Sequence, residues 1–184
     1  MTELIAALDA DVLVPILACD FLLTAFNLGL YEPVVSAQVL SEVARSLQHD
    51  FPHLDPSASA YRVGEMRAVL ADHIIDEATE APDGINPKDR HVIAAANSGG
   101  ASVLVSNDKR LRGEVDNHVL GLEARTLDAF ALMLWTRDPE AILAVVDALI
   151  TKRTRRRVKR DDLIDQLQLT MPSLALSLRS HRHH

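Results

Sequence analysis

The chain has little of what holds very small or secreted proteins together. It contains one cysteine, Cys19, among 184 residues, so an intramolecular disulfide is excluded. A chain of this length buries about 70% of the surface its unfolded state exposes. It therefore needs neither a disulfide nor a structural metal to hold its fold. The low cysteine count fits a reducing compartment, and an apolar run surrounds Cys19, where a thiol usually acts as a small hydrophobe.

Long apolar runs are absent as well. The longest early stretch is interrupted by acids, and its unbroken part, residues 12–19, is too short to span a bilayer. The first ten residues contain no Lys or Arg, so we do not expect a secretory signal peptide. Hydrophobic residues make up 48% and charged residues 24%, which excludes a disordered or collagen-like chain. We therefore expect a cytoplasmic globular protein without membrane contact.

Positive charge is scarce along most of the chain. The formal net charge is −7, yet seven of the 19 Lys and Arg residues fall between Lys152 and Arg160. This segment, the basic strip, consists of Lys152, Arg153, Arg155, Arg156, Arg157, Lys159 and Arg160. It would give an acidic chain one local contact with a polyanion, although it has no aromatic side chain for base stacking. The alternatives are a solvated loop between helices or a contact for an acidic partner.

Short apolar runs alternate with helical patterns over the first two thirds of the chain. We expect strands at 4–8, 33–35, 74–75, 102–106 and, more weakly, 119–124. We expect helices between them at 12–28, 36–48, 56–72 and 86–99. This alternation predicts an α/β fold with a parallel sheet. From Leu127 onward only helical patterns occur, so we divide the chain into an α/β domain, 1–126, and a helical C-terminal extension packed on it, 127–184.

Several acids fall at positions that matter in such a fold. Asp9 closes the first expected strand and Asp108 follows the fourth, and ligand sites in open parallel sheets form at the carboxyl ends of strands. Asp89 falls at the third position of its expected helix, and Glu42 lies about two turns into the helix after the second strand. Carboxylates that converge repel one another unless a cation such as Mg²⁺ or Mn²⁺ neutralises them.

Each acid also has a purely structural explanation. Asp89 near a helix N-terminus is favourable to the helix dipole, and Glu42 can pair with Arg45 three residues on. Asp108, with Asn107 before it, can stabilise a turn. Asp9 is the hardest to explain in this way, because a charge that ends an apolar strand is costly to bury unpaired.

Four segments resemble, in order, the sequence blocks of the PIN-domain family, over residues 4 to about 126. They are LDADVL at 8–13, SAQVLSEV at 36–43, NPKDRHVIAAA at 86–96 and VLVSNDKRL at 103–111. Two positions depart from the family pattern, because Asp11 stands where Asn is usual and Ser106 where Thr is frequent. The helical tail is similar to the C-terminal extension of one PIN subgroup.

The resemblance implies a fold and a site. The fold is a three-layer α/β/α domain with a five-stranded parallel sheet in the order 3-2-1-4-5. The implied catalytic and metal-binding residues are an acidic quartet, Asp9, Glu42, Asp89 and Asp108. This quartet would hold one or two Mg²⁺ or Mn²⁺ ions. Asp11, Ser106 and Asn107 become supporting residues, and His91 is expected to be structural or peripheral.

The implied function is metal-dependent endoribonuclease activity, in the setting of a VapC-like toxin of a type II toxin–antitoxin pair. The partners would be RNA and an antitoxin protein, and a homodimer is compatible with this reading. RNA contact through the basic strip would use Arg153, Arg155, Arg156, Arg157, Lys159 and Arg160.

Three alternatives stay open. One is an RNA-processing PIN nuclease without an antitoxin. Another is a phosphatase similar to the haloacid dehalogenases, because Asp9-Ala10-Asp11 matches their DxD signature. Against it, Leu13 stands where that signature has Thr or Val, and Glu42 and Asp89 are left without a role. The third is a non-catalytic interaction domain.

Overall fold

The computed structural model describes residues 4–50, 53, 55–75, 81–153 and 158–181. The chain divides into two compact units, which we call the sheet unit (1–14 and 31–124) and the helical unit (15–30 and 125–184). The linear division at residue 126 assigns residues 15–30 to the α/β domain, whereas the structure groups them with the C-terminal helices. A helix that is apolar on every side carries no sequence signal for the unit that will bury it.

Five short strands form one parallel sheet. They are β1 (Ile5–Leu8), β2 (Glu32–Ser36), β3 (Ile74–Ile75), β4 (Val103–Val105) and β5 (Glu123–Arg125), in the order β3-β2-β1-β4-β5. The central strand β1 pairs with β2 on one side and β4 on the other, so Ala7 lies opposite both Val34 and Leu104. Burial on both faces explains why these strands are runs of apolar residues. The predicted α/β class and strand order are confirmed.

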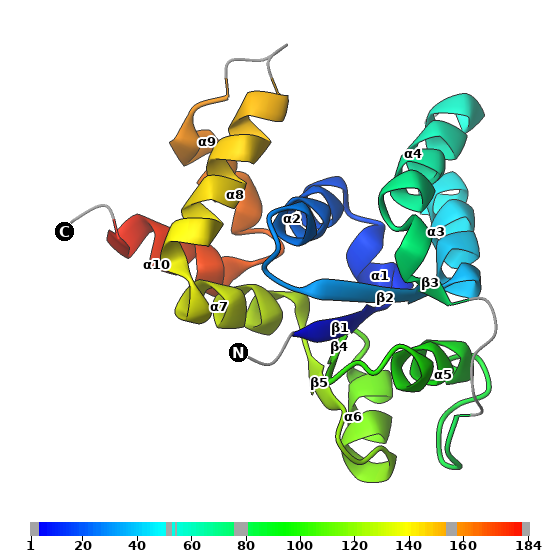
Figure 1. The fold of residues 1–184 in the computed structure, drawn as a ribbon. Coiled ribbons are helices and arrows are strands. Elements are labelled where there is room, and N and C mark those ends of the chain that lie inside the picture. The colour runs from blue at the N-terminus through cyan, green and yellow to red at the C-terminus, as the bar shows by residue number, and fades with distance from the viewer. Residues whose placement is uncertain (1–3, 51–52, 54, 76–80, 154–157, 182–184) are drawn as a thin grey trace. The chain divides into compact units, whose positions relative to one another are not determined.

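Helices cover both faces of this sheet. They are α1 (Ala10–Leu13), α3 (Ala37–Asp50), α4 (Pro56–Val69), a 3₁₀ turn (Ala71–His73), α5 (Arg90–Ser98) and α6 (Lys109–His118). Figure 1 shows α3 and α4 on one side of the sheet and α5 and α6 on the other, which gives three layers. The largest fully buried side chains here are Leu8, Leu13, Leu40, Leu47, Met66, Leu70, Ile93, Leu104 and Leu111.

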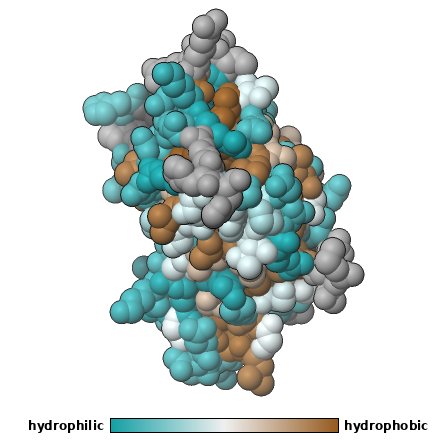
Figure 2. Space-filling model, turned by 90° about the vertical axis from the view of Figure 1, so that its left-hand side faces the viewer, coloured by the Kyte–Doolittle hydropathy of each residue, from teal (hydrophilic) through white to brown (hydrophobic). Residues whose placement is uncertain are grey.

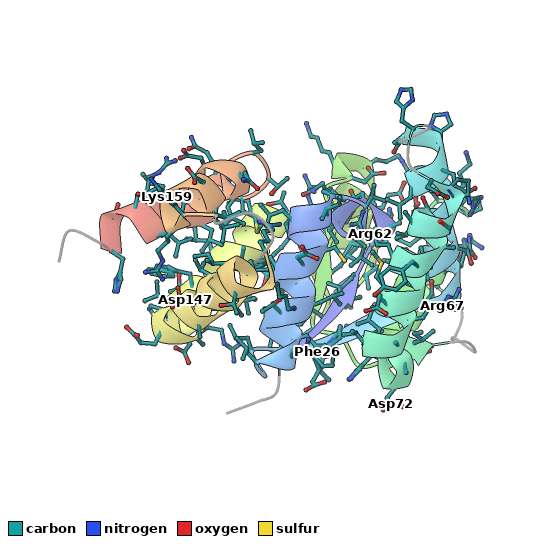
Figure 3. The ribbon with its side chains drawn as sticks, turned by 90° about the horizontal axis from the view of Figure 1, so that it is seen from above. Phe26, Arg62, Arg67, Asp72, Asp147 and Lys159 are labelled. Carbon is teal, nitrogen blue, oxygen red and sulfur yellow. The ribbon has the colours of Figure 1, made fainter. Side chains whose placement is uncertain are left out.

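The first expected helix, 12–28, is two helices in the structure. Helix α1 starts at Ala10, because the Asp9 carboxylate caps it, and α2 (Ile16–Asn27) starts after Pro15. Pro15 has extended backbone angles, φ −68° and ψ 125°, which end the first helix. The C-terminal carbonyl of α1, at Leu13, accepts a hydrogen bond from Arg62 of α4 at 3.1 Å (Figure 3).

Two other boundaries differ from the expectation. Helix α5 starts at Arg90 instead of Pro87, because the Asn86 side chain accepts a hydrogen bond from the Lys88 backbone N–H at 2.9 Å and holds a turn there. Asp89 is therefore the residue before the helix, not its third residue. Strand β5 starts at Glu123 instead of 119, because Gly121 adopts a left-handed turn with φ +81°.

The helical unit contains α2, α7 (Leu127–Arg137), α8 (Pro139–Lys152), α9 (Arg160–Leu167) and α10 (Pro172–His181). Its core is apolar, with Phe21 and Phe130 fully buried. Thr126 caps α7 and Asp138 caps α8, by accepting hydrogen bonds from Ala129 and Ala141 at 3.1 and 2.9 Å. The predicted run of C-terminal helices is confirmed.

The exposed surface mixes polar and apolar residues. Figure 2 shows brown apolar residues between teal hydrophilic ones on the face that it presents. Among its described residues, the helical unit exposes three leucines: Leu28 at 48%, Leu169 at 84% and Leu176 at 65%. In the described part of the chain, each helix is too short or too polar to cross a membrane.

Candidate functional site

The carboxyl ends of two neighbouring strands bring Asp9 and Ser106 together. Leu8 of β1 pairs with Val105 of β4, so the residues that follow the two strands are neighbours in space. The Ser106 hydroxyl donates a hydrogen bond to Asp9 Oδ2 at 2.7 Å, and the Asp9 backbone N–H donates to the Val105 carbonyl at 3.1 Å. The contact joins residues 97 positions apart, at the strand ends where sites of parallel sheets form. The supporting role expected of Ser106 agrees with this contact.

Asp108 is held by the same hydroxyl and by its own helix. Its backbone N–H donates to Ser106 Oγ at 3.1 Å. Its Oδ1 caps α6 by accepting from the backbone N–H groups of Arg110 and Leu111, at 2.7 and 3.2 Å. The structural explanation of Asp108 is therefore a helix cap, and this cap engages one of its two carboxylate oxygens.

Asp11 reaches the same loop from α1. The Asn107 backbone N–H donates to Asp11 Oδ2 at 2.8 Å, so Asn107 contacts this acid through its main chain, and its supporting role stays a prediction. The other oxygen, Oδ1, is buried and has no hydrogen-bond partner in the described structure. A buried carboxylate oxygen without a partner is costly, and it calls for a proton or a cation.

Glu42 lies on α3 and faces His91. Its Oε1 accepts a hydrogen bond from Gln38 at 3.2 Å and lies 3.8 Å from the Arg45 guanidinium. Its Oε2 lies 3.4 Å from Nε2 of His91, whose side chain is 13% exposed. The expected Glu42–Arg45 pair is present but long. His91 is buried against a member of the quartet, which the sequence did not predict.

Asp89 is paired with an arginine of the helix that follows β4. Arg110 Nη2 lies 2.5 Å from Asp89 Oδ2 and 3.5 Å from Asp108 Oδ2. Its Nη1 lies 2.8 Å from Glu114 Oε1. The Asp89 side chain makes no capping hydrogen bond to α5, so the structural explanation offered for it is replaced by this ion pair.

One cavity collects most of the acids. Its volume is about 430 Å³, and its lining consists of Asp9, Ala10, Asp11, Glu42, Arg45, Ser46 and Asp108. Three members of the predicted quartet therefore share one water-accessible space with Asp11. Asp89, the fourth, does not line it.

The environment of Asp9 and Asp11 opposes the ionisation of both side chains. Burial raises the pKa of Asp9, with smaller contributions from the charges of Asp89 and Glu42, while the hydrogen bonds from Ser106 and Ala10 act in the opposite direction. Burial, with the adjacent charge of Asp9, raises the pKa of Asp11 to about 7. A cation in the cavity would relieve both effects.

The donor set fits a hard divalent cation by its chemistry. Every acid around the cavity offers carboxylate oxygens, the ligands that Mg²⁺ and Mn²⁺ prefer, and Asp11 Oδ1 has no hydrogen-bond partner among the described residues. Among the residues that the structure describes, however, no three His, Cys, Asp or Glu side chains are arranged to hold a metal ion. The contacts give a reason: Asp89 faces Arg110, and one oxygen of Asp108 caps a helix.

The described part of the basic strip makes contacts within the helical unit. Arg153 lies 3.6 Å from Asp20, and Arg160 lies 3.2 Å from Asp147. Figure 3 labels Asp147 on α8 and Lys159, which precedes α9. Arg155, Arg156 and Arg157 lie outside the described residues. These ion pairs favour the structural interpretation for Arg153 and Arg160, and they leave RNA contact by the strip a prediction.

Sequence reasoning gave no role to Arg110 or Ser46, and it treated Arg45 only as a partner of Glu42. One local signal was available, because Arg110 stands four residues before Glu114 and can pair with it on one helix. Its contact with Asp89, 21 residues earlier, had no such signal.

Comparison with protein-family models gives no match, and comparison with curated proteins gives none either.

Proposed function

We propose that this chain is a divalent-metal-dependent endoribonuclease of the PIN type. The observation that carries the proposal is the cavity in which Asp9, Asp11, Glu42 and Asp108 meet at the carboxyl edge of a parallel sheet. Burial and neighbouring acids oppose the ionisation of Asp9 and Asp11, and carboxyl groups with pKa values shifted in this way are typical of functional sites. Glu42 belongs to the cavity, and the phosphatase alternative gave this residue no role.

The residues of the chain would divide the work as follows. Asp9, Glu42 and Asp108 would hold the cation, and Asp89 would join them once its ion pair with Arg110 opens. Ser106 fixes the orientation of Asp9 through its hydroxyl. A divalent cation bound there would supply a water of lowered pKa and stabilise charge on the phosphate. Arg45 and Ser46 line the same cavity and provide a positive charge and a hydroxyl for the RNA backbone.

The biological setting that we propose is a VapC-like toxin in the cytoplasm, inhibited by an antitoxin protein. The test is expression of the chain alone and together with a small DNA-binding protein encoded next to it. We expect growth arrest that co-expression relieves. Growth arrest without such a neighbour would favour an RNA-processing nuclease.

The biochemical test is cleavage of total RNA by the purified protein with Mg²⁺, with Mn²⁺ and with EDTA. We expect metal-dependent cleavage that Asp9→Asn and Asp108→Asn each reduce by about 100-fold or more, because each variant removes a charge from the cation site. Asp138→Asn is the matched control, since Asp138 is also a helix-capping aspartate but belongs to the helical unit.

Each rival has its own outcome in this test. Release of phosphate from a small monoester, without RNA cleavage, would favour the phosphatase. Intact RNA in every reaction, together with Mn²⁺ binding that Asp9→Asn does not weaken, would refute the nuclease and favour an interaction domain.

A further inference from the structure

Arg110 is placed between the acids of the site. Its guanidinium contacts three carboxylates: Asp89 at 2.5 Å, Glu114 at 2.8 Å and Asp108 at 3.5 Å. Two of the three belong to the predicted metal-binding quartet. A single positive side chain thus neutralises acids that a divalent cation would otherwise neutralise.

The position of Arg110 is fixed by its surroundings. Its own backbone N–H donates to Asp108 Oδ1 at 2.7 Å in the first turn of α6. Glu114, one helical turn further on, accepts from Arg110 with one oxygen and from the Asn86 backbone N–H with the other, at 2.9 Å. Glu114 therefore ties Arg110 to the turn that ends at Asp89. This connection gives the guanidinium a defined place beside Asp89.

The consequence is visible in the cavity. Asp9, Glu42 and Asp108 line it, and Asp89, which Arg110 holds, does not. An aspartate bound to a guanidinium offers that oxygen to a metal only after the ion pair opens. Opening costs free energy that would be subtracted from the free energy of cation binding.

We propose that Arg110 is a positioning residue that acts as an internal counter-ion, competing with the divalent cation for Asp89 and Asp108. The proposal rests on the metal site of the proposed function. Cation binding then requires the Arg110 side chain to leave Asp89, and Arg110 sets the cation concentration at which the quartet assembles. By reciprocity, a bound cation weakens the Arg110–Asp89 pair to the same extent.

The test is Mn²⁺ binding measured by titration calorimetry in the absence of RNA. We expect Arg110→Gln to bind Mn²⁺ about threefold to tenfold more tightly than the unmodified protein, the range expected when a partly exposed ion pair no longer competes. Arg110→Lys keeps the charge and loses the two-pronged contact, so it should bind with intermediate affinity.

Lys109→Gln is the matched control. Lys109 is the exposed neighbour of Arg110, and its replacement removes the same charge one residue away. We expect its Mn²⁺ affinity to stay within about twofold of the unmodified protein, because in the described structure Lys109 is exposed and makes no ion pair with the acids that Arg110 contacts. Equal gains for Arg110→Gln and Lys109→Gln, or weaker binding by Arg110→Gln, would overturn the proposal. If Arg110→Gln does not fold, Arg110→Lys decides the matter by the same comparison.

Failure of this inference is distinguishable from failure of the proposed function. RNA cleavage by a protein whose Mn²⁺ affinity does not respond to Arg110 would refute the counter-ion and keep the nuclease. Tighter Mn²⁺ binding by Arg110→Gln without RNA cleavage would keep the counter-ion and refute the nuclease. Absence of Mn²⁺ binding in every variant at millimolar concentration would refute both.

Discussion

The two compact units use aspartate in opposite ways. In the helical unit each of four aspartates serves the structure: Asp138 caps α8, Asp128 accepts the Ser173 backbone N–H at 2.9 Å, Asp147 pairs with Arg160 and Asp165 pairs with Arg179. In the sheet unit, Asp9 and Asp11 also make backbone hydrogen bonds, but both are largely withdrawn from water beside other acids.

The difference shows what distinguishes a structural acid from a candidate functional one. Asp9, Asp108 and Asp138 all cap helices, so capping alone does not distinguish a structural aspartate from a candidate functional one. Asp9 and Asp108 share a cavity with further carboxylates, and one oxygen of Asp11 there has no hydrogen-bond partner within the described part of the chain. Among the described residues, these four aspartates of the helical unit each cap a helix, accept a backbone hydrogen bond or pair with an arginine, whereas the cavity of the sheet unit gathers four carboxylates in one space.

The largest expected effect tests whether the two units are independent. Replacing the fully buried Phe130 by Ala should lower the free energy of unfolding of the helical unit by about 3–5 kcal/mol, because it leaves a cavity in an apolar core. Hydrogen exchange measured residue by residue should show faster opening of α7, α8 and α10 than of β1 and β4. Equal acceleration in both regions would mean that the two units open as one cooperative body.

A smaller effect sharpens the account of the buried acids. The pKa of Asp11 is about 7 in the folded protein and about 3.9 in an unfolded chain. The unfolded state therefore loses this proton first as pH rises, and the residue costs stability increasingly between about pH 4 and pH 7 and fully above it. We expect Asp11→Asn, in EDTA, to raise the free energy of unfolding at about pH 8 by about 1–2 kcal/mol.

The same variant supplies its own control. At about pH 5 Asp11 is protonated in the folded state, so the gain from Asp11→Asn should fall to less than half of its value at about pH 8. Urea unfolding of the unmodified protein and of Asp11→Asn at each pH measures the change in the free energy of unfolding. A gain in the free energy of unfolding that does not depend on pH, or a loss of stability at the higher pH, would contradict the conclusion that the Asp11 charge costs stability.

The smallest effect concerns the structural acids. Asp138→Ala removes the cap of α8 and should cost about 1 kcal/mol of stability. Its Mn²⁺ affinity should equal that of the unmodified protein, whereas Asp108→Ala should lose both its cap and metal affinity. Thermal unfolding with and without Mn²⁺ separates the two variants, because Mn²⁺ should raise the melting temperature of Asp138→Ala but not that of Asp108→Ala. If Mn²⁺ did not raise the melting temperature of Asp138→Ala, the distinction between the aspartates of the two units would fail.

Much of the fold could be predicted from local sequence. Asp55-Pro56 predicted the start of a helix, and α4 begins at Pro56 with Asp55 as its cap. The apolar runs predicted β1, β2, β3 and β4 to within about two residues. The break at Pro15 was missed, because an apolar pattern continues on both sides of it and Pro is also common in the first turn of a helix.

The candidate site could be predicted only in part. Asp9 and Asp108 follow strands, so the sequence placed them at one edge of the sheet, and the structure brings them to one cavity. Two partners of the acids could not be predicted from the sequence. His91 beside Glu42 and Arg110 beside Asp89 depend on how α5 and α6 pack, which no spacing along one element records.

The sequence by itself determined the α/β alternation, several helix starts and the chemical type of the candidate ligands, because these depend on neighbours within a few residues. Only the tertiary structure decided which carboxylates meet. Ser106 contacts Asp9 across 97 positions, and Arg110 pairs across 21 positions with Asp89, which does not line the cavity. The physical reason is that charge interactions depend on distance and burial in space, and the folded sheet sets both.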